Sequence, residues 1–195
     1  MKKWIAALLI MLCAYVFTGC GSKAEEDTTT IAVEKDGSLT STIVEAFDRE
    51  YYDAEDLKEY TLDAVAVYNA AGSDREITVS KVEAKDGTVR LQMKYGSAAD
   101  YAGFNGKEIF AGTVAEAYEE GMDLDVTLTD VSEEGVSVGK SEILQMGEKK
   151  IVILEEDVAV KVPGKILYVS EGTELLQSKS AMVHPVNGKA YIIYK

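Results

Sequence analysis

The side chains able to do covalent chemistry are few in this sequence. The 195 residues include two cysteines, Cys13 and Cys20, and a single histidine, His184. A thiolate is the most nucleophilic side chain at neutral pH, so each cysteine is a candidate for modification or catalysis. Cys13 lies inside an apolar stretch, whereas Cys20 directly follows the small residues Thr18 and Gly19. Cys20 is therefore the first candidate for covalent chemistry.

The first nineteen residues have the layout of a secretory signal peptide. Two lysines follow Met1, and the uncharged run from Trp4 to Phe17 is 14 residues long. A membrane-spanning helix needs about 20 apolar residues, so this run fits the apolar region of a signal peptide instead. The segment Thr18-Gly19-Cys20 resembles the lipobox of bacterial lipoproteins, although Phe17 stands where the family usually has leucine.

The lipobox resemblance implies cleavage after Gly19 and attachment of diacylglycerol to the thiol of Cys20. Two acyl chains anchor a protein stably. The expected organisation is a signal peptide over 1–19, a lipidated cysteine with a polar tether over 20–30, and one globular domain over 31–195, with a subdivision near 121–135 as an alternative. The expected location is the outer, extracytoplasmic face of the cell membrane, with the membrane as a partner through Cys20. An uncleaved N-terminal anchor in which Cys20 has no role is the alternative.

The charge of the chain limits its partners. Lysine and arginine total 20 against 34 acidic residues, so the net charge is −14, and loss of residues 1–19 makes it −16. Nucleic-acid binding needs clustered positive charge, so no nucleic-acid partner is expected. A body this acidic is repelled by anionic lipid, which fits a domain held on a tether.

The sequence gives little support for a metal site or a catalytic site. A zinc site built on His184 alone would be unusual, and His184 before Pro185 reads as an exposed loop residue. The acidic stretch lacks the loop pattern of a calcium site and reads as the solvent face of a strand; its members are Asp123, Asp125, Asp130, Glu133 and Glu134. No nucleophile elbow or phosphate-binding glycine loop occurs. We therefore assign no catalytic residue, metal ligand or cofactor.

The apolar periodicity predicts an α+β fold, mainly antiparallel, with two helices in the N-terminal half and a β-rich C-terminal half. A hairpin is expected around Lys35-Asp36-Gly37, with a type I′ turn, and a second around Lys85-Asp86-Gly87. Helices are expected at 54–70, behind Asp53 as N-cap, and after Thr113, with a short helix or turn at 97–105. Further strands are expected at 122–129, 136–143, 150–154, 158–162, 166–170 and 191–194.

Two longer-range similarities bear on origin. The Lys-Asp-Gly turns lie 50 residues apart, and each is followed by a strand and a helix, so a duplicated unit is one hypothesis. The last 35 residues resemble the ends of small uncharacterised lipoproteins of Gram-positive-type bacteria through Tyr168-Val169-Ser170 and the segment 190–195. That resemblance implies no activity.

Aromatic side chains give the remaining functional hypothesis. A set of them falls around the expected helices, namely Tyr51, Tyr52, Tyr101, Phe104 and Tyr118. Tyrosine can stack on a sugar or anchor a protein partner, but ordinary packing is the simpler interpretation. We expect a non-enzymatic, lipid-anchored module that binds or presents a ligand or protein at the cell surface. The alternatives are an envelope glycan or peptide hydrolase or processing factor, and an accessory subunit of a membrane transporter or sensor.

Overall fold

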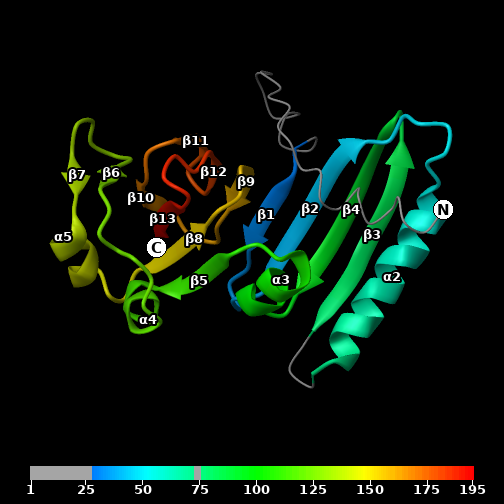
Figure 1. The fold of residues 1–195 in the computed structure, drawn as a ribbon. Helices are drawn as coiled ribbons and strands as arrows, with labels where there is room; N and C mark the ends of the chain where they lie inside the picture. Colours follow the sequence, from blue (N-terminus) through cyan, green and yellow to red (C-terminus); the bar gives the residue numbers. More distant parts are fainter. Residues whose placement is uncertain (1–27, 73–75) are drawn as a thin grey trace.

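The computed structural model describes residues 28–72 and 76–195, and these residues form four helices and thirteen strands in two sheets (Figure 1). The fold is α+β and mostly antiparallel, as the sequence predicts. In the described residues only β1 and β9 pair in parallel. Cys20 lies outside the described residues, so its lipidation stays a prediction.

The first sheet has seven strands in the order β11-β12-β9-β1-β2-β4-β3. Its strands are β1 (Thr30–Val33), β2 (Leu39–Ala46), β3 (Ile77–Lys85), β4 (Thr88–Tyr95), β9 (Val158–Lys161), β11 (Thr173–Gln177) and β12 (Ser180–Val183). The two predicted hairpins, β1–β2 and β3–β4, join through the β2–β4 pair.

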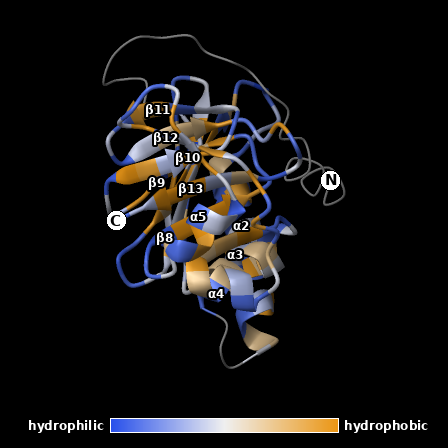
Figure 2. Cartoon of the chain, turned by 90° about the vertical axis from the view of Figure 1, so that its left-hand side faces the viewer, coloured by the Kyte–Doolittle hydropathy of each residue, from blue (hydrophilic) through white to orange (hydrophobic). Residues whose placement is uncertain are grey.

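The second sheet has six strands in the order β5-β8-β13-β10-β6-β7. Its strands are β5 (Ile109–Thr113), β6 (Leu128–Asp130), β7 (Ser137–Val138), β8 (Lys150–Leu154), β10 (Ile166–Val169) and β13 (Ala190–Tyr194). The central strands β8 and β13 are strongly hydrophobic (Figure 2). Alternate residues of these strands enter different cores, since Ile151 and Ile193 lie in one cluster and Val152 and Ile192 in the other. This sheet is therefore the middle layer of the molecule.

Local capping explains where the helices begin. Helix α2 (Ala54–Ala70) covers the predicted range, and the Asp53 carboxylate accepts hydrogen bonds from the backbone N–H groups of Glu55 (2.8 Å) and Asp56 (3.1 Å). Ser97 caps α3 (Ala98–Asn105), and Thr113 with Glu116 forms the predicted capping box of α4 (Val114–Glu119).

The prediction for the C-terminal half is wrong in one respect: helices are not confined to the N-terminal half. Helices α4 and α5 (Lys140–Gln145) both lie beyond residue 110. The strand expected at 136–143 is reduced to β7, because the backbone N–H of Gly139 donates to the Glu142 carboxylate (3.1 Å) and starts α5. The helix still buries Ile143, so the apolar pattern serves a different element.

The two Asp-Gly turns differ. Asp86 and Gly87 have φ of 52° and 75°, which gives the two-residue primed turn expected of this dipeptide. In the first hairpin only Gly37 has positive φ, and Glu34 N–H donates to the Ser38 carbonyl (2.8 Å) around a three-residue loop. The type I′ prediction is therefore wrong for Lys35-Asp36-Gly37, which forms a longer loop.

Candidate functional site

Within residues 28–72 and 76–195, the candidate side chains named from the sequence do not come together in one site. His184 is exposed at the end of β12, and its Nδ1 lies 2.8 Å from a carboxylate oxygen of Asp157. In the part of the chain that is described, no group of three or more acidic, histidine or cysteine side chains is placed to hold a metal ion. Asp123 and Asp125 are exposed while Leu124 is buried, so the predicted solvent face exists, although only 128–130 of that stretch pairs as a strand.

The five aromatic residues do not share a groove. Tyr101 and Phe104 belong to the larger core, where the Tyr95 and Tyr101 rings meet edge to face with centroids 4.9 Å apart. Tyr51 and Tyr52 form a separate group with Phe47 between β2 and α2. The aromatic-groove hypothesis is therefore wrong for the set as a whole.

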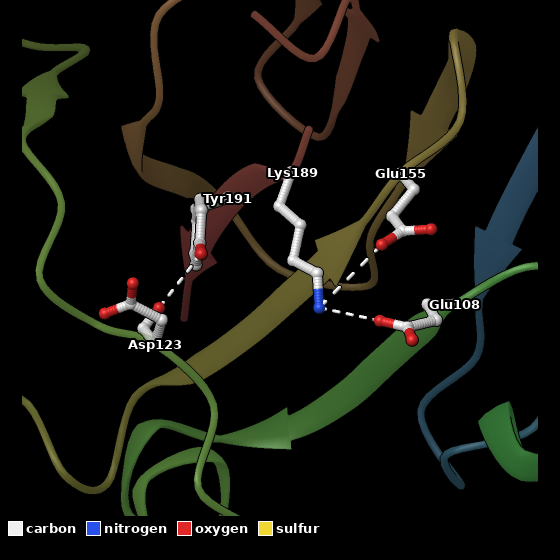
Figure 3. A network of polar contacts seen from close by, with 5 residues as sticks. All are labelled: Glu108, Asp123, Glu155, Lys189 and Tyr191. Atoms are coloured by element: carbon white, nitrogen blue, oxygen red, sulfur yellow. Dashed lines mark hydrogen bonds and ion pairs between the residues drawn. The ribbon is translucent and has the colours of Figure 1, made fainter. Parts of the chain in front are cut away.

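The turn between β8 and β9 carries three acids, Glu155, Glu156 and Asp157, which we call the acidic turn. Each acid faces a different element. Glu155 lies 3.9 Å from the Lys189 Nζ, which also donates to Glu108 (2.7 Å), while nearby Tyr191 donates to the Asp123 carbonyl (Figure 3). Asp157 contacts His184, and Glu156 points into the protein interior. The acidic turn therefore links parts of both sheets.

Glu156 is the buried member of the acidic turn, with 9% of its surface exposed. The Tyr101 hydroxyl donates to its Oε1 atom at 2.8 Å. Burial raises the pKa of Glu156, while this hydrogen bond and the charge of Lys107 act in the opposite direction. Burial also raises the pKa of Tyr95 to about 12. The sequence shows Glu156 only as one of three adjacent acids and does not mark which of them points inward.

The raised pKa of Glu156 predicts a pH-dependent stability. At pH values between the ordinary pKa of Glu156 and its raised pKa, the folded state binds more protons than the unfolded state. The free energy of unfolding therefore falls as the pH rises through this range, by up to about 1.4 kcal/mol per pH unit. Glu156→Gln removes the charge but keeps an acceptor for Tyr101. Urea unfolding should find this variant more stable than wild type at pH 7 and equally stable near pH 4. Glu155→Gln, in the same turn but exposed, is the control and should show no such gain; a pH-independent difference for Glu156→Gln would contradict the assignment.

An open groove lies on the outer face of the first sheet, at the end of β1. Registered pairing places Lys161, Ala32, Thr40 and Lys94 in one row across β9, β1, β2 and β4. The two small residues form the floor of this row and the two lysines stand at its sides. This first lobe has a volume of about 570 Å³ and is also lined by residues of the β1–β2 loop and by Pro163.

A second lobe also borders the β1–β2 loop. It has a volume of about 340 Å³ and shares Val33–Asp36 and Pro163 with the first lobe. Its other lining residues are Gly37 of the same loop and residues from β5, β8 and the end of β13: Ala111, Gly112, Lys150, Tyr194 and Lys195. We call the two together the lysine groove, because Lys35, Lys94, Lys150, Lys161 and Lys195 line it.

The acids of the lysine groove are held by neighbouring groups. The Ser38 hydroxyl (2.6 Å) and backbone N–H (3.0 Å) donate to Asp36, and they hold the pKa of that carboxyl below its usual range. Thr40 donates to Glu34 at 3.2 Å. Within residues 28–72 and 76–195, Lys35, Lys94 and Lys150 form no ion pair. The groove is thus locally cationic in a chain whose net charge is −14.

Residue 28 precedes the start of β1, and the lysine groove lies at the opposite end of this strand. Figure 1 shows the course of strand β1 from Thr30 to Val33. The residues of the β1–β2 loop, which follows this strand, line the groove. His184 follows Val183, which pairs with Val158 at the start of β9, whereas Lys161 at its end lines the groove. His184 therefore lies beside the start of β9, whereas the groove lies at the end of β9.

Comparisons with protein-family models, curated proteins and solved structures find no match to this chain. Among the described helices none has the length and apolar character needed to span a membrane.

Proposed function

We propose that this protein is lipid-anchored at the extracytoplasmic face of the cell membrane and binds an anionic ligand in the lysine groove. The anchor rests on the signal-peptide pattern and Cys20. The binding role rests on one observation, the cluster of five lysines around a two-lobed groove in an acidic chain. Both acids of the groove already accept hydrogen bonds from neighbouring hydroxyls, which favours binding over acid–base catalysis there.

The arrangement of the chain supports outward presentation of the groove. Seven residues lie between Cys20 and Thr28, and the eight Cα–Cα steps that join the two residues span at most about 28 Å. Since β1 begins at Thr30 and the groove lies toward its other end, a lipid on Cys20 would leave the groove directed away from the bilayer. The groove would then meet soluble or wall-bound ligands of the envelope.

A binding titration tests the anion site. The full chain in detergent is titrated with tripolyphosphate by calorimetry. The double variant Lys35→Ala/Lys94→Ala should bind about tenfold more weakly, because two exposed charge pairs contribute up to about 1 kcal/mol each. The matched control Lys58→Ala/Lys140→Ala removes the same charge from α2 and α5 and should change affinity less than twofold. Equal loss in both double variants, or no binding by wild type, would overturn the anion site.

The same proteins test the anchor in cells. Wild type and both lysine variants should fractionate with membranes, and Cys20→Ala should be released from them. The mass of the membrane-bound protein should show an acylated chain beginning at Cys20. Membrane retention of Cys20→Ala would contradict lipidation while leaving the binding test unaffected.

A further inference from the structure

We propose that the lysine groove binds a linear polymer of phosphodiester units joined by short polyol linkers, lying across both lobes. This inference rests on the proposed function, since the polymer is one particular anionic ligand. Four features of the groove carry it: its length, the type of its charged groups, the character of its floor and its position in the fold.

The length of the groove favours a chain over a single anion. Lys94 and Lys161 are three strand spacings apart in their row, so their Cα atoms are separated by about 14 Å. Lys150 lies beyond the β1–β2 loop in the second lobe, and Lys35 lines both lobes. One phosphate can reach one side of this row, whereas successive phosphates of one chain can meet all of these lysines in turn.

The charged groups suit phosphates on a flexible backbone. Among the described residues that line the groove there are lysines and no arginine. Arginine recognises carboxylates through a planar pair of hydrogen bonds, whereas lysine is a mobile point charge that binds phosphate without fixed geometry. A repeated, conformationally free phosphodiester matches such a row of mobile charges better than a folded acidic protein surface does.

The floor suits short linkers and offers no stacking surface for bases. Besides the lysines, the lining presents the small residues Ala32 and Pro163, with Thr40 in the same row as Ala32. Single-stranded nucleic acids bind chiefly by stacking on exposed aromatic rings. The aromatic residue of the lining, Tyr194, is 3% exposed. Carbon linkers bearing hydroxyl groups are therefore favoured over nucleotides.

The acidic remainder of the protein does not prevent this binding. The lining carries five lysines against two acids, Glu34 and Asp36, and at physiological ionic strength charges are screened over about 8 Å, so acids elsewhere in the chain act only weakly on the ligand. The position at the far end of β1 places the groove where a wall polymer can pass through it.

Synthetic glycerol phosphate oligomers of two and of eight units test the proposal on the full chain in detergent. We expect the eight-unit chain to bind at least tenfold more tightly than the two-unit chain, because occupied neighbouring subsites raise the effective concentration of the rest. Lys94→Ala and Lys150→Ala, one in each lobe, should each weaken binding of the longer chain about three- to fivefold. The two-unit chain should respond to only one of them. Lys140→Ala is the control.

The outcomes separate the two proposals. If wild type does not bind tripolyphosphate, the proposed anion site itself is wrong. If tripolyphosphate binds but the two oligomers bind equally, or Lys150→Ala leaves the eight-unit chain unaffected, the polymer inference fails and the anion site stands. Equal affinity for an oligodeoxynucleotide of eight phosphates would overturn the choice of polyol linkers.

Discussion

Tyr101→Ala is expected to lower the free energy of unfolding by about 4 kcal/mol, the cost of emptying a well-packed aromatic site. Tyr101 is 5% exposed, contacts Tyr95 edge to face and donates its hydroxyl to Glu156. The substitution leaves a cavity and a buried carboxyl without its donor, and each is destabilising. In a chain of this size the melting temperature should fall by about 8–16 °C. Thermal unfolding of the full chain measures the change.

Tyr118→Ala is the matched control for this prediction. Tyr118 is 58% exposed on α4, so its removal should alter stability by no more than about 0.5 kcal/mol. Tyr101→Phe keeps the ring and removes only the hydroxyl, so it should fall between the two. If both alanine variants lost equal stability, Tyr101 would not hold the central position that the packing assigns to it.

Local sequence patterns predicted the structure correctly where the interactions within one short segment determine it. Asp53 caps α2 at the predicted residue, Thr113 and Glu116 form the predicted box, and Asp86-Gly87 forms the primed turn. In each case the deciding interactions lie within four residues of one another. The hairpins were also predictable, because the strands they join are adjacent in the chain.

Competing local interactions account for the errors. Around residue 140 the apolar alternation suggested a strand, but the cap formed by Gly139 and Glu142 starts a helix. Around residue 36 the dipeptide suggested a two-residue turn, but hydrogen bonds from Ser38 to Asp36 accompany a longer loop. In both places a side-chain hydrogen bond changed the element while the buried residues stayed buried.

The candidate site was out of reach of sequence patterns. Lys94 and Lys161 share a row only because β9 pairs in parallel with β1, and no local signal specifies that pairing. Glu156 was visible only as one of three adjacent acids, and its partner Tyr101 lies 55 residues away. Functional surfaces made by distant strands require the sheet order, which the periodicity of single segments does not contain.

Gly172→Ala is the second substitution with a large expected effect. Gly172 precedes β11 with φ of +76°, and its carbonyl accepts a hydrogen bond from the His184 N–H at 2.9 Å. An added Cβ would overlap the His184 carbonyl oxygen and lie 2.7 Å from the Val186 Cγ2. The variant therefore combines left-handed backbone strain with a clash against backbone that cannot move away without loss of that hydrogen bond. We expect a loss of about 3 kcal/mol and a melting temperature lower by about 6–12 °C.

Gly188→Ala separates the clash from the backbone strain. Gly188 has a similar φ of +85°, but an added Cβ meets nothing within 4 Å. This control should lose only the left-handed penalty, about 1 kcal/mol. The difference of about 2 kcal/mol between the variants then measures how tightly the start of β11 is packed against the segment after β12. Equal losses would mean that the two segments separate at little cost, and that the β11–β12 hairpin is held by its own ladder rather than by this contact.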